Sequence, residues 1–177
     1  MKKTIVLAGG CFWCTEAAFL NVKGVLEVIS GYSGGKGGSP SYEKVCSGQT
    51  GFAECVKITY DEGEVSLENL LRVFFTVHDP TTLNRQGADA GTQYRSAIFY
   101  ADEQQLSTAQ HIISELGTKG YWDGAAIVTS LEPLIAFYPA EAYHQRYFEQ
   151  HQSQGYCQVV IEPKLAKLRA ELSTLLS

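Results

Sequence analysis

The chain has 177 residues, 45% of them hydrophobic, which is enough to build a core, and we expect a single domain over residues 1–177. Its formal net charge is −5 and it has no run of basic residues, which excludes nucleic acid as a partner. The apolar run that follows Lys3 ends at Gly9, too early for a signal peptide or a membrane span. We therefore expect a cytoplasmic protein with no membrane partner.

The N-terminal part of the chain predicts strand, helix, strand and loop in turn. Residues 5–8 form an apolar run typical of a strand, and a helical pattern extends from Phe12 to about Leu20. A second strand is predicted over 25–29. The loop at 31–40 is rich in glycine but satisfies neither glycine motif of the nucleotide-binding loops, so we reject nucleotide binding.

The middle of the chain contains a strand, a helix and a long polar loop. Residues 54–60 alternate with period two, which predicts a strand that places Glu54 on its apolar face. Ser66 caps a helix whose apolar side chains recur at three-to-four spacing, namely Leu67, Leu70, Leu71 and Phe74. Residues 78–96 are polar and without periodicity, which predicts a functional loop before a strand at 97–100.

The C-terminal part mixes helices and strands. We predict, in chain order, a helix over 106–116 with Gly117 past its end, strands at 126–131 and 134–138, a helix opened by Pro139, a strand at 159–161 and a last helix over 165–175. Helices and strands mixed with long loops are typical of the α+β class. We predict a two-layer sandwich, a mostly antiparallel sheet with packed helices.

Cys11 is the strongest candidate for a reactive residue. It follows Gly9 and Gly10 where the first strand gives way to a helix, and the unpaired N–H groups and dipole of a helix start lower the pKa of a thiol. The alternative is a buried structural cysteine, which would not require two preceding glycines. Phe12 and Trp13 add an apolar wall beside the sulfur.

The other cysteines are less distinctive. Five is an odd number in a chain without a secretion signal, so reduced thiols fit better than a fixed disulfide framework. Cys14 lies one helical turn after Cys11, near enough to trap an oxidised sulfur, although such a pair is also compatible with a thioredoxin-like site or half of a zinc site. Because zinc needs a second pair, we predict no metal. We interpret Cys46 and Cys55 as inert.

Glu54 and His144 each allow two interpretations. A carboxyl among apolar side chains has a raised pKa, so Glu54 could hold a proton near neutral pH and act as a general acid. The alternative is an ion pair with Lys or Arg at a strand end. His144 could indicate a Cys-His hydrolase, but we favour a structural histidine.

Eight segments resemble, in the same order, those of the A-type peptide methionine sulfoxide reductases, and the resemblance extends from about Ile5 to Pro163. They are GGCFWCTE at 9–16, SYEKVCSG at 41–48, TGFAE at 50–54, HDPT at 78–81, QGAD at 86–89, GTQYRS at 91–96, YHQ at 143–145 and GYC at 155–157. The resemblance implies a ferredoxin-like core with long surrounding loops, which the order of elements alone does not fix.

The resemblance also implies the reaction. A single catalytic domain, which we expect to be a monomer, would reduce methionine S-sulfoxide, free or in proteins, and so repair oxidised proteins. The implied intermediates are a sulfenic acid on Cys11 and then an intramolecular disulfide, which thioredoxin reduces without a bound cofactor. The implied substrate-binding residues are Phe12 and Trp13 around the methyl group, and Tyr42, Asp89 and Tyr94 around the sulfoxide oxygen or the catalytic water.

The identity of the second thiol stays open between Cys157 and Cys14. We favour Cys157, because a tail segment forms disulfide geometry with less strain than a helix-bound neighbour does. The chain departs from the family at Phe52, where histidine is usual, and at Cys55, where valine is common; both flank Glu54. Two rival functions are a dithiol oxidoreductase that reduces protein disulfides directly and a redox-sensing interaction module.

Overall fold

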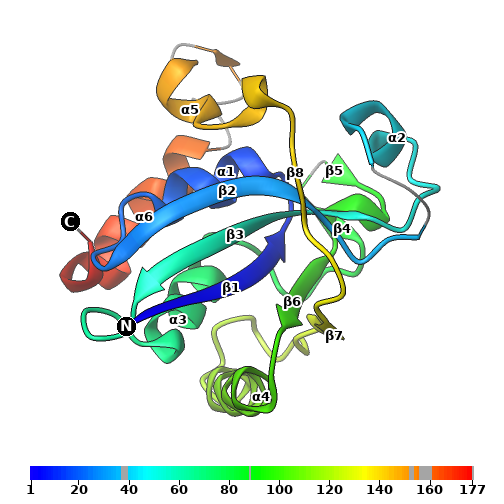
Figure 1. Cartoon of the computed structure of the whole chain (residues 1–177). Coiled ribbons are helices and arrows are strands. Elements are labelled where there is room, and N and C mark those ends of the chain that lie inside the picture. Colours follow the sequence, from blue (N-terminus) through cyan, green and yellow to red (C-terminus); the bar gives the residue numbers. More distant parts are fainter. Residues whose placement is uncertain (37–39, 88, 152–153, 156–160, 177) are drawn as a thin grey trace.

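The computed structural model describes residues 1–36, 40–87, 89–151, 154–155 and 161–176. Its centre is a sheet made of β1 (Lys2–Gly9), β2 (Val25–Ser33), β3 (Ala53–Asp61), β6 (Ser96–Tyr100), β7 (Ser130–Pro133) and β8 (Tyr138–Pro139). The strands lie in the order β7-β6-β1-β3-β2-β8 (Figure 1). Neighbouring strands are antiparallel except β6 and β7, which are parallel.

The longer helices are α1 (Phe12–Phe19), α3 (Leu67–Val77), α4 (Glu103–Gly117) and α6 (Glu162–Leu172). They pack on one another, because α3 contacts the other three, while α1 also packs on β2 and β3. The Ser66 hydroxyl caps α3, and the Asp102 carboxylate caps α4. The fold is therefore α+β with a mostly antiparallel sheet. No helix in the described part of the chain is long and apolar enough to cross a membrane.

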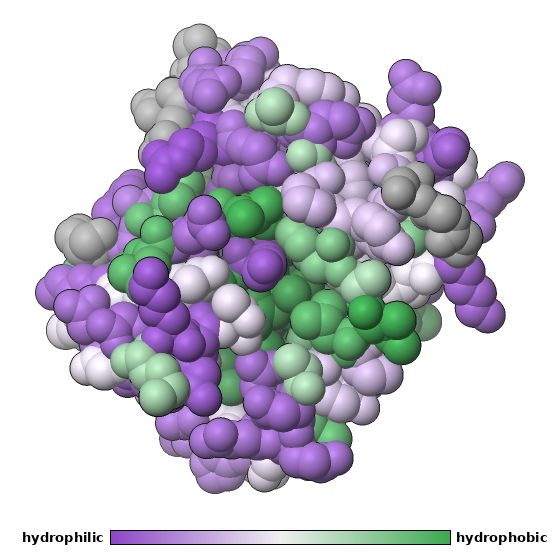
Figure 2. Space-filling model, in the orientation of Figure 1, coloured by the Kyte–Doolittle hydropathy of each residue, from purple (hydrophilic) through white to green (hydrophobic). Residues whose placement is uncertain are grey.

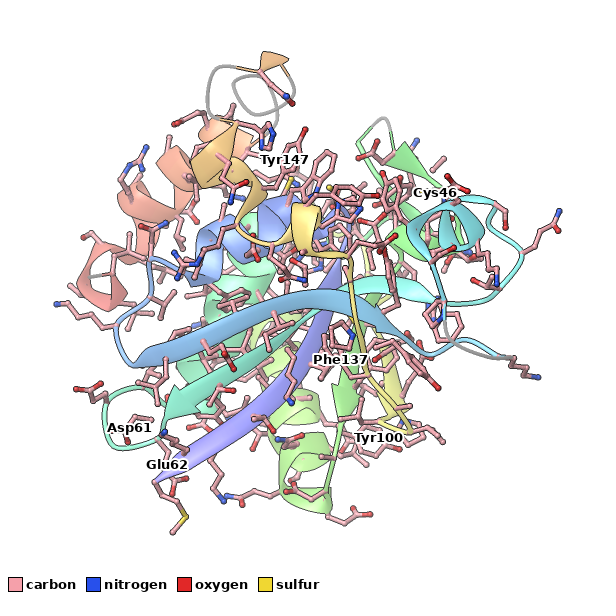
Figure 3. All side chains as sticks on the ribbon, turned by 45° about the horizontal axis from the view of Figure 1, so that its top comes forward. Cys46, Asp61, Glu62, Tyr100, Phe137 and Tyr147 are labelled. Atoms are coloured by element: carbon pink, nitrogen blue, oxygen red, sulfur yellow. The ribbon has the colours of Figure 1, made fainter. Side chains whose placement is uncertain are left out.

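The two faces of the sheet bury different side chains. In β1, Ile5 and Leu7 join the large core shared with the helices, whereas Val6 and Ala8 belong to a smaller cluster on the opposite face. Phe137 helps to cover that smaller cluster, and Figure 3 shows it in front of the sheet. Figure 2 shows the surface in the orientation of Figure 1, with an apolar band between hydrophilic margins.

Short elements gather at the end of the sheet where β1 stops. They are α2 (Tyr42–Cys46), β4 (Arg85–Gln86), β5 (Asp89–Ala90), η1 (Thr92–Tyr94), η2 (Ala142–His144) and α5 (Tyr147–Gln150), while η4 (Ser173–Leu175) follows α6. Figure 1 shows α5 and α2 near this end of the sheet. Most of the predicted functional loop 78–96 is thus short strands and turns.

The predicted elements of the first two thirds of the chain are confirmed. Strands at 5–8, 25–29, 54–60 and 97–100, and helices starting at Phe12, after Ser66 and before 106, are all present. β2 extends four residues further than predicted, to Ser33. α2 is an element that the sequence patterns did not predict. Gly117 is the last residue of α4 and not the residue past its end.

The C-terminal predictions are partly wrong. The strands predicted at 126–131 and 134–138 are reduced to β7 and β8, which overlap only the ends of those ranges. Pro139 opens no helix but pairs with Gly31 at the sheet edge, because its fixed φ and missing N–H suit an edge strand as well as a first helical turn.

The last predicted strand and helix have mixed outcomes. Of the strand predicted at 159–161, residues 159 and 160 lie outside the described residues, and Ile161 is the N-cap of α6. The last helix is confirmed as α6 as far as Leu172, after which the chain continues as the short η4.

Candidate active site

Cys11 lies between the end of β1 and the first residue of α1, at the predicted junction of strand and helix. It is the N-cap residue of α1, its side chain makes no capping hydrogen bond, and it is 8% exposed. Gly10 makes this turn possible, since its φ is +89° and a Cβ there would lie 2.6 Å from Cγ of Gln86. The sulfur is thus placed at a helix start, where backbone N–H groups favour a thiolate.

Glu54 lies next to this junction, as a site that combines Cys11 and Glu54 requires. It is on β3, opposite Tyr32 of β2, and is 1% exposed. Its Oε1 accepts a hydrogen bond from the backbone N–H of Phe12 at 3.2 Å. Its Oε2 is buried and has no partner among the described residues. The carboxyl is therefore held beside the residue that follows Cys11, by a backbone N–H and not by Lys or Arg.

The surroundings of Glu54 keep it protonated at neutral pH. Burial raises the pKa of Glu54 to about 8. Electrostatic interactions with Asp89 and Cys14 also raise it, whereas the hydrogen bond from the Phe12 N–H lowers it. Since Oε1 accepts the N–H of Phe12, the proton belongs on Oε2, the oxygen without a described partner. Such a carboxylic acid can donate a proton to a group placed beside Cys11.

Aromatic rings surround the start of α1. Phe12 is fully buried, with its ring centroid 5.2 Å from that of His144 and 6.4 Å from that of Tyr42. The indole N–H of Trp13 donates to Nδ1 of His144 at 3.1 Å, and the Trp13 ring stacks on Tyr147 at 3.7 Å. Figure 3 shows Tyr147 near the start of α1. We call Phe12, Trp13, Tyr42, His144 and Tyr147 the aromatic wall.

The aromatic wall contains two residues that local sequence patterns do not place there. The sequence favours a structural role for His144, which is buried and hydrogen-bonded to Trp13, but the ring also joins the wall that carries the candidate substrate residues. No motif points to Tyr147. The only local signal was its spacing of three residues from His144, which does not reveal that both rings reach α1 from the far end of the chain.

Tyr42, Tyr94 and Asp89 lie around the same carboxyl. Burial raises the pKa of Tyr94, and so do the nearby groups of Glu54, Cys46, Asp89 and Cys11. Burial also raises the pKa of Tyr42, as do its hydrogen bond with Cys46 and its electrostatic interactions with Glu54 and Tyr94. Both phenols therefore stay neutral and remain hydrogen-bond donors. Asp89 and Cys11 line one cleft of about 610 Å³.

The remaining cysteines differ in position. Cys14 is buried in the first turn of α1, where its N–H donates to the Cys11 carbonyl at 3.1 Å. Cys46 is exposed on α2, as Figure 3 shows. Cys55 is buried on the sheet face away from Glu54, and burial raises the pKa of its thiol, which makes it unreactive. Cys157 lies outside the described residues.

Phe52, the first of the two departures from the family, belongs to the same core cluster as Phe12. Phe52 is buried, and its ring meets Tyr138 edge-on at 5.7 Å. A Cβ on Gly35 would lie 2.3 Å from the Phe52 ring, so this residue depends on the glycine for space.

A cysteine at a helix start, a protonated carboxyl beside it and neutral phenols around that carboxyl are the groups that a thiol-dependent oxidoreductase needs. Comparison with known proteins gives the family. Residues 3–175 match the family described as peptide methionine sulfoxide reductase. A protein of Chromobacterium violaceum named peptide methionine sulfoxide reductase MsrA is 56% identical over 176 residues, which cover 99% of both chains. The chain therefore belongs to the peptide methionine sulfoxide reductase family.

Two solved structures of Mxr1 from Saccharomyces cerevisiae are similar to most of this chain. The reduced form is 37% identical, covers 88% of this chain and 89% of its own, and has a TM-score of 0.80. A complex of Mxr1 with Trx2 is 28% identical, covers 82% and 84%, and has a TM-score of 0.56.

Proposed function

We propose that this chain reduces methionine S-sulfoxide, free or in proteins, to methionine, and thereby repairs oxidised proteins. The observation that carries the proposal is the buried carboxyl of Glu54, which the Phe12 N–H holds beside Cys11 and whose Oε2 has no partner among the described residues. Burial raises its pKa to about 8, so it can hold a proton at neutral pH. A sulfoxide presents the matching pair of atoms, an electrophilic sulfur for the thiolate and a basic oxygen for the acid.

Each step of the proposed reaction balances. The Cys11 thiolate attacks the substrate sulfur and forms a sulfur–sulfur bond while Glu54 protonates the sulfoxide oxygen. The resulting hydroxyl then passes from the substrate sulfur to the Cys11 sulfur, which breaks both the sulfur–oxygen bond and the new sulfur–sulfur bond. Methionine leaves and the oxygen remains on Cys11 as a sulfenic acid, so the cysteine is oxidised by two electrons as the substrate is reduced. A second thiol, which we propose is Cys157, displaces water from the sulfenic acid to form a disulfide. A dithiol donor then reduces that disulfide by exchange.

The proposed substrate contacts follow from the same surroundings. The substrate methyl group would lie against Phe12 and Trp13, in the aromatic wall. The neutral phenols of Tyr42 and Tyr94 would donate hydrogen bonds to the oxygen as it gains negative charge. Asp89, beside Glu54, would hold the catalytic water.

Further parts of the proposal concern the protein as a whole. The donor is a thioredoxin, supported by the Mxr1 relative that was solved with Trx2, and the thiol steps need no bound metal or organic cofactor. We propose one cytoplasmic, monomeric catalytic domain over residues 1–177. We also propose a ferredoxin-like, two-layer core, supported by the order β6-β1-β3-β2 with α1 and α3 as its crossovers.

The proposed reaction can be tested in a single turnover without reductant. The reduced protein is mixed separately with the S and R epimers of N-acetylmethionine sulfoxide, and the product and the disulfides are identified by mass spectrometry. We expect the S epimer alone to give one methionine for each protein, together with a bond between Cys11 and Cys157. In the Cys157→Ser variant, dimedone should trap a sulfenic acid on Cys11.

Two results would contradict these steps. A bond between Cys11 and Cys14 would replace Cys157 as the resolving thiol and leave the reaction intact. Reduction of a protein disulfide such as insulin, without release of methionine from either epimer, would favour a dithiol oxidoreductase.

The Gly10→Ala variant tests whether the turn before Cys11 positions the thiol. The added Cβ would collide with Gln86 in a left-handed backbone conformation, so we expect kcat/KM to fall at least about tenfold and stability by about 1–3 kcal/mol. Gly120→Ala is the matched control, because that glycine also has a positive φ but none of the described residues lies within 4 Å of its Cβ position. Equal activities of the two variants, measured with the melting temperatures, would argue against positioning by Gly10.

A further inference from the structure

Glu16 is a buried carboxyl that the proposed reaction does not use. It lies on α1 one turn after Phe12 and is 1% exposed. The Ser30 hydroxyl of β2 donates to its Oε2 at 3.3 Å, and the backbone N–H groups of Arg146 and Tyr147 also donate to the carboxyl. Buried carboxyls are retained where such donors compensate for lost hydration. Glu16 therefore joins α1 to β2 and to the chain before α5.

The backbone at Arg146 is bent toward this carboxyl. Arg146 has φ 53° and ψ 37°, a left-handed conformation that side chains other than glycine adopt at a cost. Tyr147 begins the right-handed α5 directly after it. Left-handed and right-handed residues in succession turn their N–H groups to one side and form a cradle for an anion. The strained residue thus aims two successive donors at Glu16.

Residues 144–147, which carry these two N–H groups, contribute His144 and Tyr147 to the aromatic wall. Tyr147 stacks on Trp13 with an angle of 7° between the rings, and Trp13 donates to His144. Between these two wall residues, the Gln145 amide exchanges hydrogen bonds with the backbone of Ser30 at 2.9 and 3.0 Å. The segment is therefore fixed to β2 through Gln145 and to α1 through Glu16.

We propose that Glu16 is a positioning residue for substrate binding, which holds Tyr147 against Trp13 through the N–H groups of Arg146 and Tyr147. This inference rests on the proposed function, in which Trp13 contacts the methyl group of the substrate. Glu16 touches neither the substrate nor Cys11 in this proposal. Loss of the Glu16 carboxylate should weaken the binding of methionine sulfoxide. The rate of the chemical step at saturating substrate should change little.

The test is the Glu16→Gln variant, compared with Glu132→Gln as a matched control. Glu132 is a partly buried carboxylate that pairs with Arg95 outside the aromatic wall, so its variant reports the general effect of losing a structural carboxylate. We expect Glu16→Gln to raise KM for N-acetylmethionine S-sulfoxide about tenfold, with kcat within about threefold of wild type. Glu132→Gln should lower the melting temperature and leave KM unchanged.

A spectroscopic readout separates positioning from general destabilisation. In a Trp122→Phe background Trp13 is the only tryptophan, and Glu16→Gln should make it more accessible to acrylamide quenching, whereas Glu132→Gln should not. Unchanged KM and quenching in Glu16→Gln would overturn the inference. Absence of sulfoxide reduction by the wild-type protein would instead reject the proposed function, since quenching does not depend on activity.

A second pair of variants examines the same contact from the other side. Arg146→Gly and Arg146→Ala both remove the guanidinium, but only glycine adopts the left-handed conformation at little cost. We expect KM of Arg146→Ala to exceed that of Arg146→Gly about threefold. Equal KM values of the two Arg146 variants would contradict the inference. This pair also tests the role of Glu16 if Glu16→Gln does not fold.

Discussion

Replacing Cys11 by serine is expected to abolish the reduction of methionine sulfoxide, with a loss of at least about 10⁴-fold. The variant keeps a side chain of similar shape at the N-cap of α1. A serine hydroxyl is not ionised at neutral pH, and it can neither attack the sulfoxide sulfur nor form a sulfenic acid. The measurement is the amount of methionine released under single-turnover conditions.

Cys55→Ser is the matched control for this prediction. It makes the same chemical change in a cysteine that is also buried but lies on the sheet face away from Glu54. We expect it to lower stability without loss of activity, since burial keeps that thiol protonated. Activity retained by Cys11→Ser would reject the proposed nucleophile, and with it the order of steps derived from its position.

The centre of the candidate site could be predicted from the sequence because its determinants are local. Two glycines, a cysteine and a helical pattern specify the junction at Cys11. The period-two alternation of β3 specifies that Glu54 faces the helices while Cys55 faces away. Only their proximity needed the fold, which brings the Phe12 N–H to the carboxyl across 42 residues of sequence.

The parts that could not be predicted depend on distant partners. The glycines that begin at Gly31 predict a loop, yet Gly31 lies inside β2 and pairs with Pro139 of β8. A glycine is needed there because Phe137 and the Tyr138 carbonyl approach the backbone too closely for any Cβ. The aromatic wall is likewise assembled from α1, α2 and residues 144–147, whose conformation depends on contacts with Glu16 and Ser30. Local propensities carry no information about such contacts.

Replacing Glu54 by glutamine should slow sulfoxide reduction by about 10²–10³-fold at pH 7, because the amide cannot give a proton to the sulfoxide oxygen. Burial raises the pKa of Glu54 to about 8, so wild-type Glu54 is protonated below that pH and loses its proton above it. The wild-type rate of the first step should therefore fall above pH 8, and the ratio of wild-type to variant rates should shrink there. A ratio that stays constant from pH 6 to pH 9.5 would argue against a general acid.

The same raised pKa sets the sign of a stability effect, which reports the ionisation of Glu54 without reference to activity. The ordinary pKa of 4.5 applies to the unfolded chain and about 8 to the folded one, so the folded state binds the proton more tightly. Stability should then decrease as pH rises from about 4.5 to 8, by roughly 5 kcal/mol at most. Glu54→Gln lacks this titration. Its free energy of unfolding in urea should therefore rise relative to that of the wild type between pH 5 and pH 9.

Glu132→Gln provides the opposite case for the unfolding measurement. Burial alone would raise the pKa of Glu132, but hydrogen bonds from Arg95 and Ser130 outweigh burial and hold it below its ordinary value. A carboxyl whose pKa is lowered by folding stabilises the folded state at every pH above its pKa in the unfolded chain. That stabilisation is lost only when the pH falls through its pKa in the folded chain. The deficit of Glu132→Gln should therefore stay constant between pH 6 and pH 9, where Glu54→Gln gains. If both variants responded alike to pH, the protonated state of Glu54 at neutral pH would have to be abandoned, and with it the proton donor of the first step.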